Sequence, residues 1–317
     1  MKLLKLVPDH TNIDFMHWRN FALVLSLVVT IASVTFTIYR GLNLGIDFVG
    51  GEVVRAEFTQ PVHIDDLRNR VARLGVGEAG ITTLGKDNRS YQIRLPKPPG
   101  PESASNAMVS KLRTMIPQQY PGARVDAGES VSGKVSEELA KDSALAVALA
   151  MLGIAIYIWF RFEWQFGVGA LLTLAHDIAM TLGFFAFTRL PVDLNVVAAF
   201  LTIIGYSLND TVVIYDRIRE NLRKYRKMAI LPLLNLSLNE TLARTVVTSL
   251  TVLIALGVLM LIGPSVIFGL AIAIFLGVVI GTYSSIYISS PVLVWLGVQP
   301  DSFLKADEKD APEAQPA

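Results

Sequence analysis

The distribution of apolar residues constrains this chain more than any other feature of its sequence. A helix needs about 20 mostly uncharged residues to cross a hydrocarbon core about 30 Å thick. Six stretches meet that requirement, at 21–39, 143–160, 164–188, 194–215, near 245–262 and near 266–289. The last two belong to one charge-free run that Gly263 and Pro264 divide, and this pair is a turn signal. The sequence therefore predicts an α-helical membrane protein with six transmembrane helices.

Composition excludes several other classes of protein. Only 17% of the residues are charged, whereas soluble domains carry about 25%. The chain has no cysteine, which excludes disulfides, thiol catalysis and cysteine-ligated metal sites. A formal net charge of +1 gives no reason to expect a nucleic-acid partner. We expect no metal and no cofactor.

The positions of the basic residues predict the orientation of the spans. Arg161 and the basic stretch 217–227 follow spans that would return the chain to the side of its amino terminus. Lysine and arginine in short loops mark the cytoplasmic side, so both termini are expected there. Residues 1–20 and the loop at about 216–243 would be cytoplasmic. Within that loop we expect the basic stretch 217–227 to form an interfacial helix whose charges meet anionic membrane lipid. The tail 301–317 has a composition typical of disorder.

The first apolar stretch, 21–39, follows Lys2, Lys5 and Arg19 and so has the basic start of a secretory signal. Its apolar run is longer than that of a signal, and no small-residue cleavage site follows it. We therefore interpret it as a retained transmembrane helix.

Residues 40–142 separate the first two spans and are long enough to form a domain on the opposite, non-cytoplasmic face. Their apolar pattern alternates between the strand period and the helix period in the order strand, helix, strand, strand, helix, strand. This order is typical of a ferredoxin-like α+β domain. The segment contains no recognisable catalytic set, so we predict a binding or coupling module.

Two acidic residues, Asp177 and Asp210, interrupt otherwise apolar spans. A carboxylate at the centre of a membrane helix costs about 2.5–3.5 kcal/mol on insertion scales, so each is a functional candidate. The alternative is a polar contact that locks two helices together. His176 precedes Asp177, but neighbouring side chains diverge by about 100° around a helix. We therefore expect the two to contact different neighbours.

Arg244 is the expected counter-charge, because it comes just before the fifth apolar run. If that helix begins near 228–236, Arg244 lies about 18 Å along it and within the membrane. Thr248 follows one turn later, on the same face. An interfacial Arg244 that binds a lipid phosphate is the alternative. Buried acids near a base are the components of a proton relay.

Several motifs, taken in order, identify a family. They are GLNLGIDFVGG at 41–51, RFEW at 161–164, AHD at 175–177, GYSLNDT at 205–211, YDRIREN at 215–221, TLART at 241–245 and TS at 248–249. The glycine-rich segment 41–51 lacks a nucleotide-binding pattern, and we interpret it as a turn that joins the first span to the domain. Together with the six spans and the large loop, these motifs closely resemble the SecF family of bacterial protein-export proteins.

The resemblance implies half of a twelve-span transporter of the resistance–nodulation–division type, paired with SecD in the bacterial inner membrane. It implies a non-enzymatic subunit of the Sec pathway that uses the proton motive force, without ATP, to complete preprotein translocation. Further implied partners are the SecYEG channel, YajC and, indirectly, the SecA motor. At matching positions, Asp210 would carry protons, Arg244 would face an aspartate of SecD, Thr248 would be a polar neighbour, and Asp177 would have a relay or structural role.

Two other functions remain open at this point. A homodimeric efflux transporter for small molecules or lipids would have the same six spans and would need an apolar pocket in its soluble domain. An intramembrane hydrolase would use Asp177 and Asp210 as a carboxylate dyad. Arg244 argues against the hydrolase, because a fixed cation disrupts a pair of acids that share one proton.

Overall fold

The computed structural model describes residues 8, 11–73, 79–84, 87–95, 102–126, 130–264 and 267–299. The expected disordered tail at 301–317 lies outside the described residues. The chain divides into two compact units, one of helices and a smaller one formed mainly by residues 43–146 together with 191–194.

The smaller unit is built on an antiparallel sheet with two covering helices. Its elements are β1 (Asn43–Leu44), α2 (Ile46–Val49), β2 (Gly51–Glu57), α3 (Ile64–Ala72), β3 (Gly80–Thr83), β4 (Ser90–Leu95), α4 (Glu102–Gln119), β5 (Arg124–Asp126), β6 (Ser130–Val131) and β7 (Pro191–Val192). The main sheet has the order β3-β4-β2-β5, and β6 also pairs with β2. This is the strand order of a split βαβ domain, so the ferredoxin-like prediction is confirmed.

Alternation along the strands explains this fold. Tyr91, Ile93 and Leu95 of β4 are buried, and the residues between them are only partly covered. Leu112 and Ile116 of α4 are fully buried in the same core. Alternating side chains give the sheet one apolar face, and α4 covers that face.

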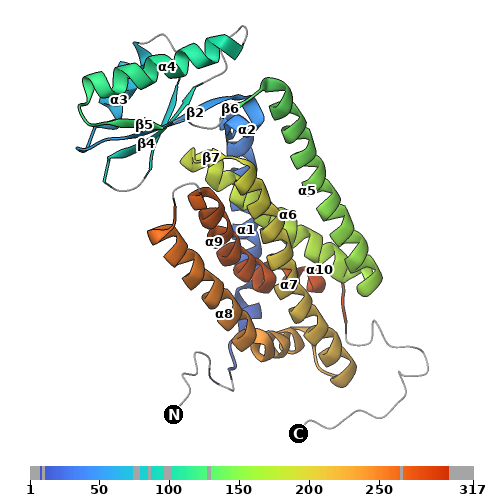
Figure 1. The fold of residues 1–317 in the computed structure, drawn as a ribbon. Coiled ribbons are helices and arrows are strands. Elements are labelled where there is room, and N and C mark those ends of the chain that lie inside the picture. Colours follow the sequence, from blue (N-terminus) through green and yellow to red (C-terminus); the bar gives the residue numbers. More distant parts are fainter. Residues whose placement is uncertain are drawn as a thin grey trace. The chain divides into compact units, whose positions relative to one another are not determined.

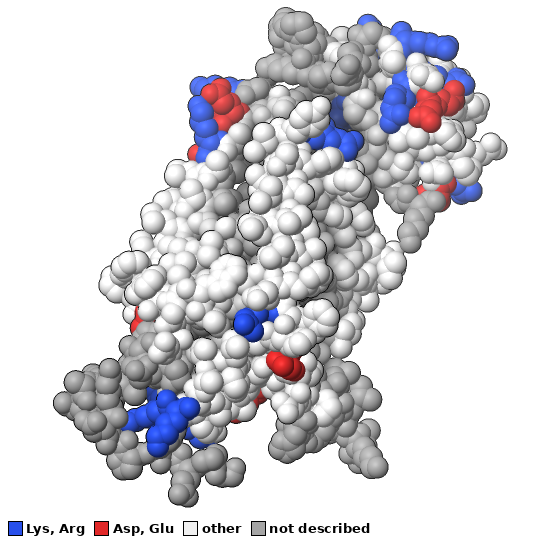
Figure 2. Space-filling model, turned by 180° about the vertical axis from the view of Figure 1, so that it is seen from behind, with Lys and Arg blue, Asp and Glu red and all other residues white. Residues whose placement is uncertain are grey.

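Most residues of the six predicted spans lie in the helical unit (Figure 1). They comprise η1 (Phe15–Trp18) with α1 (Arg19–Arg40), α5 (Gly133–Arg161), α6 (Trp164–Thr188), α7 (Leu194–Lys224), α8 (Ile230–Ile262), and α9 (Phe268–Ser284) with the π-helical turn η3 (Ser285–Ser289) and α10 (Ser290–Trp295). α6 packs against α1 and α9, and α8 packs against α9. The face of these helices seen in Figure 2 is a broad area with few charged side chains, as expected for a lipid-facing surface.

The helices extend beyond the apolar runs that predicted them. α7 continues to Lys224 and α8 already begins at Ile230, so the segment predicted as a loop at about 216–243 is helical at both ends. Asn221 explains why, because its amide donates to Ser237 Oγ at 3.0 Å and to Glu240 Oε2 at 2.7 Å. These hydrogen bonds join the polar ends of the two helices. The early start of the fifth span is confirmed, and it places Arg244 about 21 Å from the beginning of α8.

Candidate functional site

Asp210 lies on α7 and is buried among hydroxyl groups of two other helical segments. Thr245 of α8 donates to Asp210 Oδ1 at 2.6 Å, and Ser285 of η3 donates to Oδ2 at 2.8 Å. Asp210 is 8% exposed. Each carboxyl oxygen therefore has its own hydroxyl partner, which satisfies a polar group that would otherwise be costly inside an apolar bundle.

Asp177, on α6, has an equivalent but separate set of partners. Ser207 of α7 and Ser284 of α9 both donate to Asp177 Oδ2, at 2.5 and 2.9 Å. Oδ1 lies 2.9 Å from Nδ1 of His176. The residue is completely buried.

The π-helical turn connects the two acids. Ser284 and Ser285 are consecutive, yet Ser284 donates to Asp177 and Ser285 donates to Asp210. On α7, Ser207 and Asp210 are three residues apart and therefore share a face. A π turn, which is frequent at functional sites, begins at this point. The two acids are thus connected indirectly, through one turn of α7 that carries both Ser207 and Asp210 and through the neighbouring residues Ser284 and Ser285.

The structure corrects the prediction for His176. Its ring nitrogen Nδ1 lies 2.9 Å from the carboxylate of the adjacent Asp177, although we expected different neighbours. The divergence of 100° describes the Cα–Cβ bonds, whereas rotation about the side-chain bonds brings the ring back to its neighbour. The His176 ring also lies beside Tyr283, with centroids 6.4 Å apart.

Arg244 and Thr248 are not part of this buried cluster. Both are exposed on α8, and the Thr248 hydroxyl donates to the helix carbonyls of Arg244 and Thr245. Among the described residues, the Arg244 guanidinium makes no ion pair with Asp210 or with any other acid. Arg244 and Thr245 are adjacent, so α8 presents its cation outward and its hydroxyl inward to Asp210.

The hydroxyl partners of the two acids were not predicted from the sequence. Ser207 and Thr245 lie inside motifs that were recognised, but no role was assigned to their side chains. Ser284 and Ser285 lie in a long apolar run, where serine alone indicates only close packing. Buried acids require donors, but the same run contains many other serine, threonine and tyrosine hydroxyls, so the sequence did not single out these two serines. Among the described residues, no three His, Asp or Glu side chains lie together in a group that could hold a metal ion.

The glycine-rich segment 41–51 has the tight backbone that was predicted. Gly41, Gly50 and Gly51 have positive φ values of 68°, 72° and 129°, a region that glycine tolerates. The segment also forms α2 and pairs with β7 in parallel, and the N–H of Gly45 donates to the carbonyl of Val192 at 2.7 Å. Its role is therefore structural as well as connecting.

Comparison with known proteins decides the family. The sequence model described as "Protein export membrane protein SecD/SecF, C-terminal" matches residues 112–299, and the "SecD/SecF GG Motif" matches residues 40–62. The chain belongs to the SecD/SecF family. A protein translocase subunit SecF from Cereibacter sphaeroides is 42% identical over 93% of both chains. Another from Rickettsia rickettsii is 40% identical over 92% of this chain and 94% of its own.

Solved SecDF structures share the fold of this SecD/SecF family member. The crystal structure of SecDF from Thermus thermophilus, described as a translocon-associated membrane protein, matches with a TM-score of 0.83 and 34% identity. The match covers 90% of this chain and only 39% of that one. SecDF in its super-membrane-facing form matches with a TM-score of 0.66 at the same 34% identity. The chain thus corresponds to a part of the larger SecDF polypeptide.

Proposed function

We propose that this chain is the SecF-type subunit of a protein translocase and that it uses the proton motive force, together with SecD, to help complete preprotein translocation. Membership of the SecD/SecF family supports the translocase role, because the relatives of nearly full length are named translocase subunits. The observation that carries proton coupling is Asp210, a buried carboxyl group on a membrane-spanning helix with hydroxyl partners on two neighbouring segments.

The hydroxyl partners suit a carboxyl group that gains and loses a proton. Thr245 and Ser285 can donate to an ionised carboxylate, and either hydroxyl can rotate to accept from the protonated acid. Protonation would therefore change the direction of these hydrogen bonds and the preferred packing of α7 against α8 and η3. Asp177 would act as a second acid in the relay, because it connects to the first through Ser284, Ser285 and the shared face of α7.

Arg244 would provide the cation at the surface where SecD packs. Its exposure on α8 supports this role, because a guanidinium on a membrane-facing surface needs an anionic partner, and an aspartate of SecD would supply one. Thr248, one turn away on the same helix face, would be its polar neighbour. Thr245 would then connect the two charged residues of the relay, because it is adjacent to Arg244 in sequence and donates a hydrogen bond to Asp210.

The remaining partners and the orientation complete the proposal. The chain would lie in the inner membrane with both termini in the cytoplasm and its α+β domain in the periplasm, and no cofactor would be needed. It would act beside SecYEG and YajC on preprotein that SecA has delivered, without catalysing a chemical reaction. The efflux and hydrolase hypotheses lose support, because the relatives are translocase subunits and Asp177 and Asp210 have separate hydroxyl partners.

Preprotein release tests the proposal. Inverted vesicles or spheroplasts carrying this chain with SecD would be compared with and without a proton gradient, using the wild type, Asp210→Asn and Asp142→Asn. Asp142 is exposed on α5, so its variant makes the same chemical change outside the relay. We expect Asp210→Asn to insert normally and to lose the gradient-dependent gain, whereas Asp142→Asn keeps it. An equal gain in all three proteins would remove Asp210 from the mechanism.

A further inference from the structure

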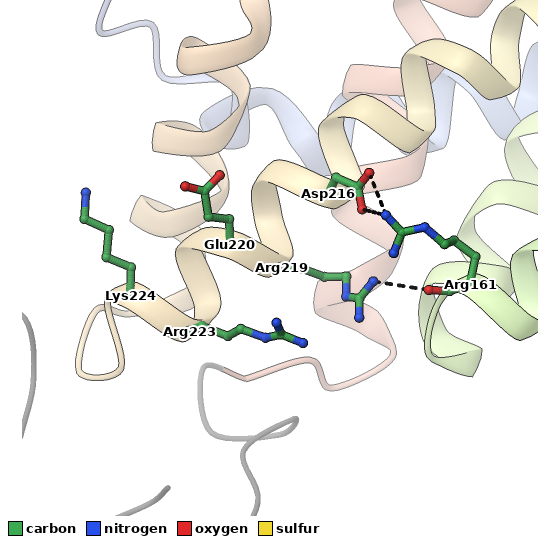
Figure 3. A pocket seen from close by; sticks show the side chains of 6 residues that line it. All are labelled: Arg161, Asp216, Arg219, Glu220, Arg223 and Lys224. Carbon is green, nitrogen blue, oxygen red and sulfur yellow. Dashed lines mark hydrogen bonds and ion pairs between the residues drawn. The ribbon is translucent and has the colours of Figure 1, made fainter. Parts of the chain in front are cut away.

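A charged hollow of about 480 Å³ lies between the end of α5 and the last turns of α7 (Figure 3). Four cationic and two acidic side chains line it: Arg161, Arg219, Arg223, Lys224, Asp216 and Glu220. The side chains of Arg219 and Arg223, one helical turn apart, extend toward Arg161, and Glu220 points to another side of α7. The hollow is separate from the buried acids of the proposed relay.

Two of the arginines are held in place by contacts of their own. Arg161 bonds Asp216 at 3.1 Å, and Arg219 Nε lies 3.4 Å from Glu163. Arg219 also donates to the carbonyl of Arg161 at 3.2 Å. Both guanidinium groups lie over the ring of Phe162, at 5.2 and 5.3 Å from its centroid. Fixed guanidinium groups lose little entropy when they bind an anion.

The cations of the hollow outnumber the acids available to neutralise them. Asp216 pairs with Arg161 and Glu163 pairs with Arg219, while Glu220 pairs with Arg217, which does not line the hollow. Within the described part of the chain, Arg223 forms no ion pair. An anion placed among the three arginines would therefore meet the uncompensated charge of Arg223 beside two guanidinium groups that already have acidic partners. The geometry of several guanidinium forks favours a phosphate group.

The surroundings of the hollow indicate where that phosphate comes from. Trp159, Phe160 and Trp164 flank Arg161 in sequence and are 71%, 86% and 53% exposed. Exposed aromatic residues at helix ends mark the level of the lipid headgroups. Leu149, Leu152 and Ile156 form an exposed apolar stripe on α5 at helical spacing, and only 6% of the most apolar part of that helix is buried within this chain. The site thus joins an anionic position to an apolar surface.

We propose that this hollow binds the phosphate of an anionic phospholipid, with the acyl chains lying along the exposed face of α5. Arg219 and Arg223 of α7 and Arg161 of α5 bind the headgroup together, so that the lipid bridges the ends of two spans. The site is specified by three arginines that the fold brings together, whereas the basic stretch 217–227 alone would give only general attraction to a charged membrane.

Native mass spectrometry of the full chain, purified in mild detergent with its co-purifying subunits, tests the site. The probes are dioleoyl phosphatidylglycerol, dioleoyl phosphatidylcholine and inorganic phosphate. The proteins are the wild type, Arg219→Gln/Arg223→Gln, the single variant Arg223→Gln, and Arg226→Gln/Lys227→Gln. The last variant removes the same charge as the first from the same basic stretch, but its residues do not line the hollow.

We expect the wild type to retain phosphatidylglycerol in preference to phosphatidylcholine. Each pocket arginine removed should lower that retention by about fivefold, which corresponds to about 1 kcal/mol, and the control should behave like the wild type. The single variant Arg223→Gln, which disturbs no ion pair among the described residues, keeps the test valid if the double variant misfolds. Equal retention of both lipids, or equal loss in pocket and control variants, would overturn the proposal. So would inorganic phosphate that displaces phosphatidylglycerol at equal concentration, since the site would then recognise soluble phosphate.

Discussion

Replacing Thr245 by valine tests whether the hydroxyl groups around Asp210 belong to the relay. Valine has nearly the shape of threonine but no hydroxyl, so it removes the 2.6 Å hydrogen bond to Asp210 Oδ1 and leaves Ser285 as a donor. Thr245 is 1% exposed, and water therefore has little access to replace the lost bond. A hydrogen bond to a charged group contributes about 1.5–3 kcal/mol.

That loss applies chiefly to the ionised form of Asp210, because the protonated acid needs fewer donors. A change of about 1.4 kcal/mol corresponds to a factor of ten in an equilibrium constant, so the ratio of ionised to protonated Asp210 should fall at least about tenfold. If the ionised form is required in each cycle, gradient-driven preprotein release should decrease by a similar factor. Release without a gradient should not change.

The assay is preprotein release from spheroplasts or inverted vesicles at matched membrane levels of the chain. Thr251→Val is the control, because Thr251 lies on the same helix, is exposed, and within the described part of the chain bonds only to the carbonyls of Val247 and Thr248. Thr245→Ser, which keeps the hydroxyl, should restore much of the activity. The reasoning is refuted if Thr245→Val and Thr251→Val both release preprotein like the wild type.

Two further predictions concern Arg244 and the α+β domain. Arg244→Lys should lose gradient-dependent preprotein release although it keeps a positive charge, because an ammonium lacks the planar guanidinium that pairs with both oxygens of a carboxylate. Normal release by both Arg244→Lys and Arg244→Ala would exclude the residue from the relay. In the domain, hydrogen bonds from Tyr120 and Arg70 lower the pKa of Asp66, so this acid should stabilise the folded domain above pH of about 4 and lose that effect as the pH falls through its lowered pKa. Tyr120→Phe should therefore reduce the acid sensitivity of thermal unfolding below pH 4, and an unchanged profile would contradict the assignment. Burial and the bond to Asp66 raise the pKa of Tyr120 to about 12. The absorbance change caused by ionisation of Tyr120 should therefore occur near pH 12 in the wild type and be missing from Tyr120→Phe.

The α+β domain was predictable because its information is local. Alternation in 90–95 and helical spacing in 64–72 each define an element from a few neighbouring residues, and the order of the elements permits few topologies. The prediction missed the division of the last strand into β5 and β6. Both pieces pair with β2, so their positions depend on a distant partner strand.

Helix ends were harder to predict than helix positions. Span prediction relied on uncharged runs and therefore stopped α7 near residue 215, where acidic and basic residues begin. The helix continues because Arg217 pairs with Glu240 at 2.7 Å and Asn221 bonds to α8. These partners lie about 20 residues away in sequence, and hydropathy cannot detect them.

The sequence by itself determined the six spans, the fold of the soluble domain and the presence of two acids inside the membrane, because hydrophobic periodicity and the cost of burying charge act on each segment separately. Only the tertiary structure decided which groups those acids contact. A hydrogen bond requires two atoms about 3 Å apart, and the partners of Asp177 and Asp210 come from four helical segments separated by as many as 107 residues. Their convergence depends on how the helices pack, which places two consecutive serines, at the junction of α9 and the π-helical turn, against two different acids.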